Sequence, residues 1–215
     1  MVRISTIVVA PAIFGAMGFL YSLIGLAGHP NALISLEPFR SLTVQEIGGH
    51  VSFGFLAALP SRNLKLALIC GLMAITIDTD HILNAMRIPV EGRIDHSIPF
   101  AIISPIAIGF LAARLDLGQP KRNGSKNAFT TARLVPSGPI FWKFFVLTLA
   151  AFMAHIAYDT ILDDHALFPI LAPFSFNLVM IPRAYGLVIE AAAGLLTYVS
   201  FRRLSSIITA RAQAD

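Results

Sequence analysis

Long apolar segments separated by short polar stretches dominate this chain. Predominantly apolar runs cover residues 4–27, 64–86, 98–115, 140–162 and 184–201, and a shorter run covers residues 47–60. The hydrocarbon core of a bilayer is about 30 Å thick, so a helix needs roughly 20 apolar residues to cross it. The pattern therefore predicts an all-α, polytopic transmembrane helical bundle with about six spans, or about five if the short segment does not cross.

The composition strengthens this prediction. Of the 215 residues, 56% are hydrophobic and only 13% are charged, whereas an ordinary soluble domain carries about 25% charged residues. We therefore expect residues 1–215 to form a single integral-membrane domain. The one cysteine, Cys70, lies inside an apolar segment, so neither a disulfide framework nor a thiolate metal cluster is expected.

The basic charge of the chain is explained by membrane topology. With six spans and the N-terminus inside, the 16 lysine and arginine residues lie on the cytoplasmic side except Arg40, Arg87, Arg93 and Arg183. This bias is the one that positive residues show in cytoplasmic (inner) membrane proteins. A five-span arrangement with the N-terminus outside is equally asymmetric. Neither requires a nucleic-acid partner, and we expect none.

Two polar stretches stand out between the apolar segments. Residues 115–139 are basic and rich in glycine, and they predict a flexible cytoplasmic loop that could also touch anionic lipid head groups. Residues 161–183 contain several prolines, which forbid a regular helix throughout. This second stretch predicts either a lid-like loop over a site at the outer face or a plain amphipathic loop.

Metal-ligand side chains gather at the same ends of the apolar segments. Asp78, Asp80, His81, His96, His155 and Asp159 reach the outer face in both topologies, and six spans bring His50 there as well, which favours six. Imidazole and carboxylate together are ligands for a divalent transition metal such as zinc, with manganese as an alternative. We therefore predict a site for one or two ions at the outer face.

The spacing of these residues along the sequence makes some of them stronger metal-ligand candidates than others. His155 and Asp159 are four residues apart, so their side chains share one helix face and can bind one metal, although a structural hydrogen bond is the alternative. Asp78 and His81 share a face, whereas Asp80 points elsewhere unless the helix unwinds. His165 could add a ligand or merely hydrate its loop.

Glu190 is the remaining ionisable candidate. It lies about one turn inside the last apolar segment, on nearly the same side as Arg183. A structural pair between the two is the favoured interpretation. A catalytic base near the metal is the alternative, because ionisable residues at membrane depth are usually functional.

In order and spacing, these residues resemble a known family, the membrane-bound metal-dependent hydrolases, whose family name also describes them as LexA-binding and inner-membrane-associated. The resemblance covers residues from His50 to about Ser175. The corresponding pieces are His50, Asp78-Thr79-Asp80-His81, His96-Ser97, His155-Ile156-Ala157-Tyr158-Asp159 and Pro173-Phe174-Ser175. Two departures are Asp95, where threonine is more usual, and Asp163-Asp164-His165, where threonine and glycine are common.

The resemblance implies a membrane-embedded metal-dependent hydrolase. The ligands would be His50, Asp80, His81, His96, His155 and Asp159, with Asp78 as a bridging ligand or general base. His165, where the chain departs from the family, is a further metal-ligand candidate that the resemblance does not supply. A more distant analogy links the series to the zinc-dependent phospholipase C and P1 nuclease group. Because the site would lie at head-group depth, the expected reaction is cleavage of a phosphoester in a lipid or lipid-linked substrate by metal-activated water.

Two other classes of protein remain open. A metal-binding transporter or sensor would also place such ligands in a helix bundle, but the inner halves of these segments offer only isolated polar residues such as Lys143. A non-catalytic membrane scaffold could instead recruit a cytoplasmic protein partner through residues 115–139, as the family name implies.

Overall fold

The computed structural model describes residues 4–28, 43–78, 94–115, 117, 138–163, 166–175 and 177–214. The helices among them confirm the predicted all-α fold. The elements are α1 (Ile4–Gly28), α2 (Val44–Ala58), η1 (Leu59–Ser61), α3 (Leu64–Thr76), η2 (Ile94–His96), α5 (Ile98–Arg114), α6 (Gly138–Leu162), β1 (Leu167–Phe168), β2 (Val179–Met180) and α7 (Ala184–Ala214).

Side-chain caps define where three of the helices begin. The Thr43 side chain accepts a hydrogen bond from the backbone N–H of Glu46 at the start of α2. Asn63 accepts from two backbone N–H groups in the first turn of α3. Ser97 accepts from the N–H of Phe100 at the start of α5, immediately after His96. Such caps satisfy N–H groups that have no partner inside the helix.

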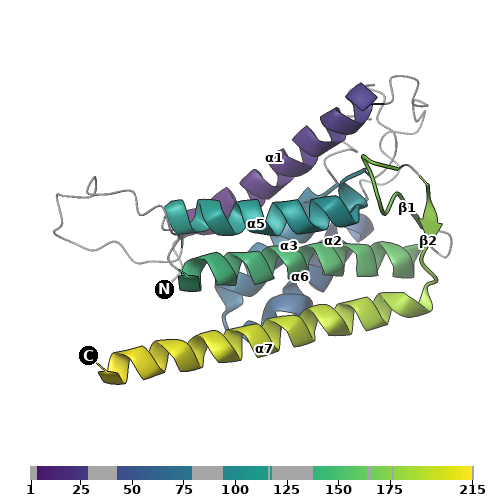
Figure 1. Cartoon of the computed structure of the whole chain (residues 1–215). Coiled ribbons are helices and arrows are strands. Elements are labelled where there is room, and N and C mark those ends of the chain that lie inside the picture. Colours follow the sequence, from purple (N-terminus) through teal and green to yellow (C-terminus); the bar gives the residue numbers. More distant parts are fainter. Residues whose placement is uncertain are drawn as a thin grey trace.

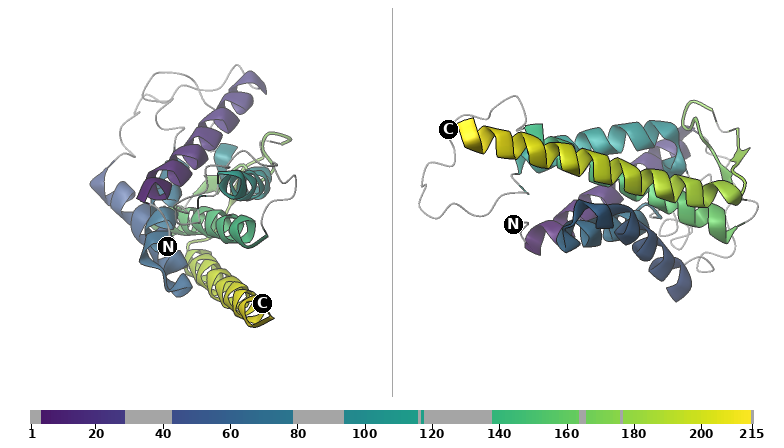
Figure 2. Two further views of the ribbon diagram at one scale, coloured as in Figure 1. Left: turned by 90° about the vertical axis from the view of Figure 1, so that its left-hand side faces the viewer. Right: turned by 90° about the horizontal axis from the view of Figure 1, so that it is seen from below.

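Helix α6 is the centre of the bundle. It contacts α2, α3, α5 and α7, and most of its residues are buried. Viewed from the end, α1 and α7 lie on opposite sides of the molecule (Figure 2). Side chains that reach the central helix are therefore shielded from the surroundings by the other helices.

The helices alternate in direction. The N- and C-terminal ends lie at one end of the bundle, and the antiparallel β1–β2 pair lies at the other, where α6 ends and α7 begins (Figure 1). Two termini at one end require an even number of passes along the bundle. This arrangement agrees with the expectation that His50 lies at the same end as the other ligand candidates.

Three of the helices are long and apolar enough to cross a membrane: Ser5–Ile24, Gly138–Leu162 and Ala184–Ser206. This number is smaller than the six that the sequence predicts. The helices Leu64–Thr76 and Ile98–Arg114 are apolar but shorter, and α2 has 15 residues. At 1.5 Å per residue α2 is about 22 Å long, less than the roughly 30 Å of a hydrocarbon core.

Apolar side chains also face outward along the bundle. Leu20, Phe110, Leu187 and Leu195 are examples from three different helices, and each exposes more than a third of its surface. Outward apolar faces of this kind suit contact with lipid. The fold is therefore consistent with membrane association.

Helices α2 and α3 approach each other closely because glycines face each other between them. A Cβ atom added at Gly54 would lie 2.7 Å from the Cys70 carbonyl oxygen and 2.8 Å from Cα of Gly71. A Cβ added at Gly71 would lie 2.6 Å from the carbonyl oxygen of Val51. Small residues permit such backbone contact between membrane helices, and here the contact holds His50 on α2 beside the end of α3.

Candidate metal centre

Five of the predicted ligands meet in one buried cluster. His50 comes from α2, Asp78 from the turn after α3, His96 from η2, and His155 and Asp159 from α6. None of the five is more than 9% exposed. Buried ionisable groups are costly unless they are paired or coordinate a metal, so their convergence requires a chemical explanation.

His50 contributes one edge of the cluster. Its Nε2 atom lies 3.3 Å from Oδ2 of Asp78 and 3.3 Å from Oδ1 of Asp159. Its ring stacks on that of His155, with 4.1 Å between centroids and 14° between planes. The stacking holds both imidazoles with their ring edges directed at the carboxylates.

His96 and His155 form the opposite edge. Nε2 of His96 lies 3.2 Å from Oδ2 of Asp159, and Nε2 of His155 lies 3.5 Å from the same oxygen. Oδ1 of Asp78 is 3.4 Å from Nε2 of His155 and 3.9 Å from Nε2 of His96. Each carboxylate thus has one oxygen toward His50 and its other oxygen toward the His96–His155 pair.

The second ring nitrogen of His155 fixes which atom faces the cluster. Its Nδ1 lies 2.8 Å from the backbone carbonyl oxygen of Ala74. A carbonyl oxygen can only accept a hydrogen bond, so Nδ1 must carry the proton. In the neutral ring, Nε2 therefore presents its lone pair to the cluster, as a metal ligand does.

His96 is oriented in the same way by a carboxylate. Its Nδ1 lies 2.8 Å from Oδ1 of Asp95, which is fully buried. A carboxylate behind a histidine is the usual arrangement at metal sites, where it sets the tautomer and raises the basicity of the ligand. Asp95 thus acts on the cluster through His96.

The two imidazole nitrogens that face each other need a positive charge between or near them. Nε2 of His96 and Nε2 of His155 are 2.7 Å apart. With both Nδ1 atoms protonated, two neutral rings would bring lone pair against lone pair at this distance. A proton on one ring or a metal ion bound by both removes the repulsion.

The electrostatics of His96 agree with this requirement. Burial lowers the pKa of this imidazole, but the negative charges of Asp95 and Asp159 and their hydrogen bonds raise it, with a net increase to about 10. Opposite charges close to a buried group favour its charged form. The surroundings therefore favour a cation at this position.

The hairpin that contains β1 and β2 covers one side of the cluster. The Phe168 ring stacks against His96 with 6.0 Å between centroids, and the N–H of Ile98 donates to the carbonyl oxygen of Ile170 at 2.8 Å. On the opposite side Tyr158 meets His50 edge-on, with its hydroxyl donating to the Gln45 carbonyl. The sequence predicts either a lid-like loop or a plain amphipathic loop for residues 161–183, and Phe168 and Ile170 of this stretch lie beside His96 and Ile98.

Four predicted site residues are not among the five that meet in the described cluster, and three of these four cannot be placed. Asp80, His81 and His165 lie outside the described residues. Glu190 is on α7, its Oε2 atom is buried without a hydrogen-bond partner in the described structure, and it forms no ion pair with Arg183 there. The favoured Arg183–Glu190 pair is therefore not seen, and a catalytic role for Glu190 stays a prediction.

Two acidic residues beside the cluster were missed as functional candidates in the sequence. Oε2 of Glu46 lies 3.8 Å from Nε2 of His50, one helical turn away. Asp95 appeared only as a departure from a family pattern. The sequence contains a feature that could have identified each of them. Glu46 and His50 are four residues apart, and Asp95 directly precedes a ligand candidate.

Comparison of the chain with models of known protein families, with curated proteins and with solved structures finds no match. The chemistry of the cluster must therefore be argued from its own residues.

Proposed function

We propose that the cluster binds a divalent transition metal through His50, Asp78, His96, His155 and Asp159. The observation that carries this proposal is the convergence of three imidazole Nε2 atoms on two carboxylates, with two of the Nδ1 atoms held by other acceptors. Ligands of one zinc ion at about 2.0–2.1 Å lie roughly 3–3.5 Å from one another. The nitrogen–oxygen distances of 3.2–3.9 Å are close to that range.

The donor set also bears on metal identity and number. Nitrogen and carboxylate oxygen ligands without thiolate suit zinc first and manganese second. Because Asp78 and Asp159 each divide their oxygens between His50 and the His96–His155 pair, they could bridge two ions. Glu46 is placed to complete the His50 side.

We further propose that the chain is a membrane-embedded hydrolase that cleaves a phosphoester of a lipid or lipid-linked substrate. A bound divalent metal supplies two things to such a reaction: it lowers the pKa of a water molecule and polarises a phosphoryl oxygen. The resemblance to membrane-bound metal-dependent hydrolases supports this reaction class, since the motif residues His50, Asp78, His96, His155 and Asp159 meet in one place. Asp78, the least buried of the five, is the residue best placed to meet substrate.

The proposed setting is the cytoplasmic membrane, crossed six times, with the cluster at the outer face. The alternating helix directions and the shared end of the two termini support an even number of passes. The distribution of lysine and arginine supports a cytoplasmic position for the terminal end.

Metal analysis tests the proposed site. Detergent-purified protein should contain zinc or manganese in a stoichiometric amount by mass spectrometry, and the His155→Ala, Asp159→Ala double variant should contain less than about a tenth of it, because it lacks two of the ligands. Asp163→Asn is the matched control, since Asp163 is an exposed residue directly after the same helix. Equal metal in the native protein and the double variant, or no metal in either, would indicate a structural polar cluster and favour the scaffold alternative.

The role of Asp95 can be tested separately. Asp95→Asn leaves all five proposed ligands in place but weakens the acceptor for Nδ1 of His96. We expect metal affinity to fall by about 10–100-fold, the usual effect of losing such a partner. Competition with a chelator of known affinity measures this change, and an unchanged affinity would show that His96 needs no support from Asp95.

A further inference from the structure

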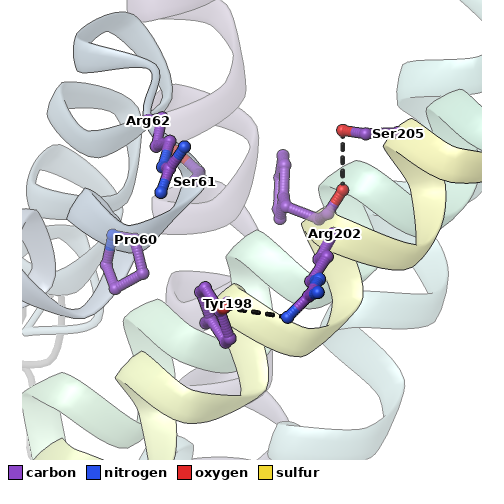
Figure 3. Close-up of a pocket in the computed structure, with 7 residues that line it drawn as sticks. Pro60, Ser61, Arg62, Tyr198, Arg202 and Ser205 are labelled. Carbon is purple, nitrogen blue, oxygen red and sulfur yellow. Dashed lines mark hydrogen bonds between the residues drawn. The ribbon is translucent and has the colours of Figure 1, made fainter.

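A cavity lies at the other end of the bundle from the metal centre. It has a volume of about 450 Å³ and opens between the turn that follows α2 and the C-terminal part of α7. Figure 3 shows Pro60, Ser61 and Arg62 on one side and Tyr198, Arg202 and Ser205 on the other. A volume of about 300–1,000 Å³ is usual for ligand sites.

The cavity is positively charged. Arg62 and Arg202 line it, and no acidic residue is among its described lining residues. An adjoining cavity of about 170 Å³ shares Ser61 and Ser205 and adds Lys143. Cationic side chains around one cavity repel each other unless an anion lies between them.

Hydrogen bonds orient the α7 side of the cavity. Nη1 of Arg202 donates to the hydroxyl oxygen of Tyr198 at 3.2 Å, and the Ser205 hydroxyl donates to the Phe201 carbonyl (Figure 3). A guanidinium has five N–H donors, so Arg202 keeps most of them for a ligand. Planar N–H pairs of this kind match the oxygens of a phosphate group.

The opposite side is held by an unusual backbone conformation at Arg62. This residue has φ 56° and ψ 27°, in the left-handed region, and its N–H donates to the Leu59 carbonyl oxygen. Glycine adopts this conformation without strain, whereas a residue with a Cβ does not. A residue other than glycine is uncommon in this conformation, and its presence here motivates the hypothesis that the arginine side chain has a role.

The position of the cavity along α7 favours one source of the anion. The candidate span Ala184–Ser206 contains Arg202 and Ser205 in its last turns, so in the proposed membrane setting, on which this inference rests, the cavity lies at the depth of lipid head groups. This end also carries the basic residues predicted to be cytoplasmic, and anionic lipids attract such clusters. We propose that the cavity binds the phosphate of an anionic phospholipid of the cytoplasmic leaflet through Arg62 and Arg202, separately from the metal centre.

Native mass spectrometry of the full chain in detergent tests this proposal. The protein is incubated with phosphatidylglycerol or with phosphatidylcholine of the same acyl chains. We expect phosphatidylglycerol to be retained roughly tenfold more strongly, and the Arg62→Gln, Arg202→Gln variant to lose that preference, because two charge-assisted contacts are removed. The Lys65→Gln, Arg114→Gln variant removes the same charge at the same end outside this cavity and should behave as the native chain.

Two further measurements distinguish a lipid site from a folding defect and from a free-phosphate site. Arg62→Gly removes the guanidinium while relieving the backbone, so it should bind phosphatidylglycerol less well without a lower thermal midpoint. Inorganic phosphate is added as a competitor, and displacement of the lipid at equal concentration would identify a free-phosphate site and overturn the proposal. Equal retention of both lipids, or full retention by the double glutamine variant, would also overturn it. Metal content is measured in parallel and should be unchanged.

Discussion

Replacing Asp78 by asparagine is expected to lower phosphoester hydrolysis by about a thousandfold or more. Oδ1 of Asp78 faces His155 and His96, and Oδ2 faces His50. An amide keeps one acceptor oxygen, brings an NH₂ group toward nitrogen lone pairs and removes a negative charge. Loss of several kcal/mol of metal-dependent transition-state stabilisation corresponds to a rate decrease of about this size.

The assay measures phosphate release from phosphatidic acid in mixed micelles with zinc or manganese supplied. Asp163→Asn makes the same chemical change at an exposed position just after α6 and should keep native activity. Metal content distinguishes two reasons for a loss. A variant that binds metal normally but does not turn over would assign Asp78 to proton transfer, whereas full turnover would remove Asp78 from the site.

The position of each site residue along its helix axis can be predicted well from the sequence. Apolar runs locate the helices, and polar residues at their ends show which side chains share a level along the bundle. His155 and Asp159 could be paired in advance because a four-residue spacing fixes one helix face. His50 could be placed with them only by choosing the topology, and its 3.3 Å distance to Asp159 shows that it lies at the same end of the bundle.

The rotation of each helix about its own axis, which decides the face that meets a neighbour, is much harder to predict. Helix α6, a candidate membrane span, is apolar on all sides, so no polar stripe marks the face that meets a neighbour. The Arg183–Glu190 pair illustrates the difficulty. The seven-residue spacing implies a common helix face, but α7 begins at Ala184, so Arg183 precedes the helix and the spacing argument fails.

The role of Asp95 depends on local geometry that spacing does not reveal. Adjacent residues on a regular helix or strand point in different directions. In η2 the chain turns so that Oδ1 of Asp95 reaches Nδ1 of its neighbour His96. The cavity beside Arg62 could not be predicted from the sequence either, because residues about 140 positions apart in the sequence line its two sides.

The glycine contact between α2 and α3 offers a test of how packing supports the metal centre. Gly54→Ala adds a Cβ atom 2.7 Å from the Cys70 carbonyl oxygen and 2.8 Å from Cβ of Ala74, whose carbonyl orients His155. Two of the three nearest atoms are backbone atoms of α3, from Cys70 and Gly71, and they leave little room to adjust. We expect the protein to lose about 1–3 kcal/mol of stability, as overpacked sites do. Displacement of His50 relative to Asp78 should also weaken metal binding.

Gly48→Ala is the matched control because it makes the same change in the same helix at a position where an added Cβ meets nothing within 4 Å. That variant should be unchanged or more stable by roughly 0.5–1 kcal/mol, since alanine restricts the unfolded chain and favours helix. Thermal unfolding in detergent and metal content are measured for both. If Gly54→Ala were as stable and as rich in metal as Gly48→Ala, close approach of α2 to α3 would not be what positions His50. A lower midpoint with normal metal content would separate the packing of the two helices from the assembly of the site.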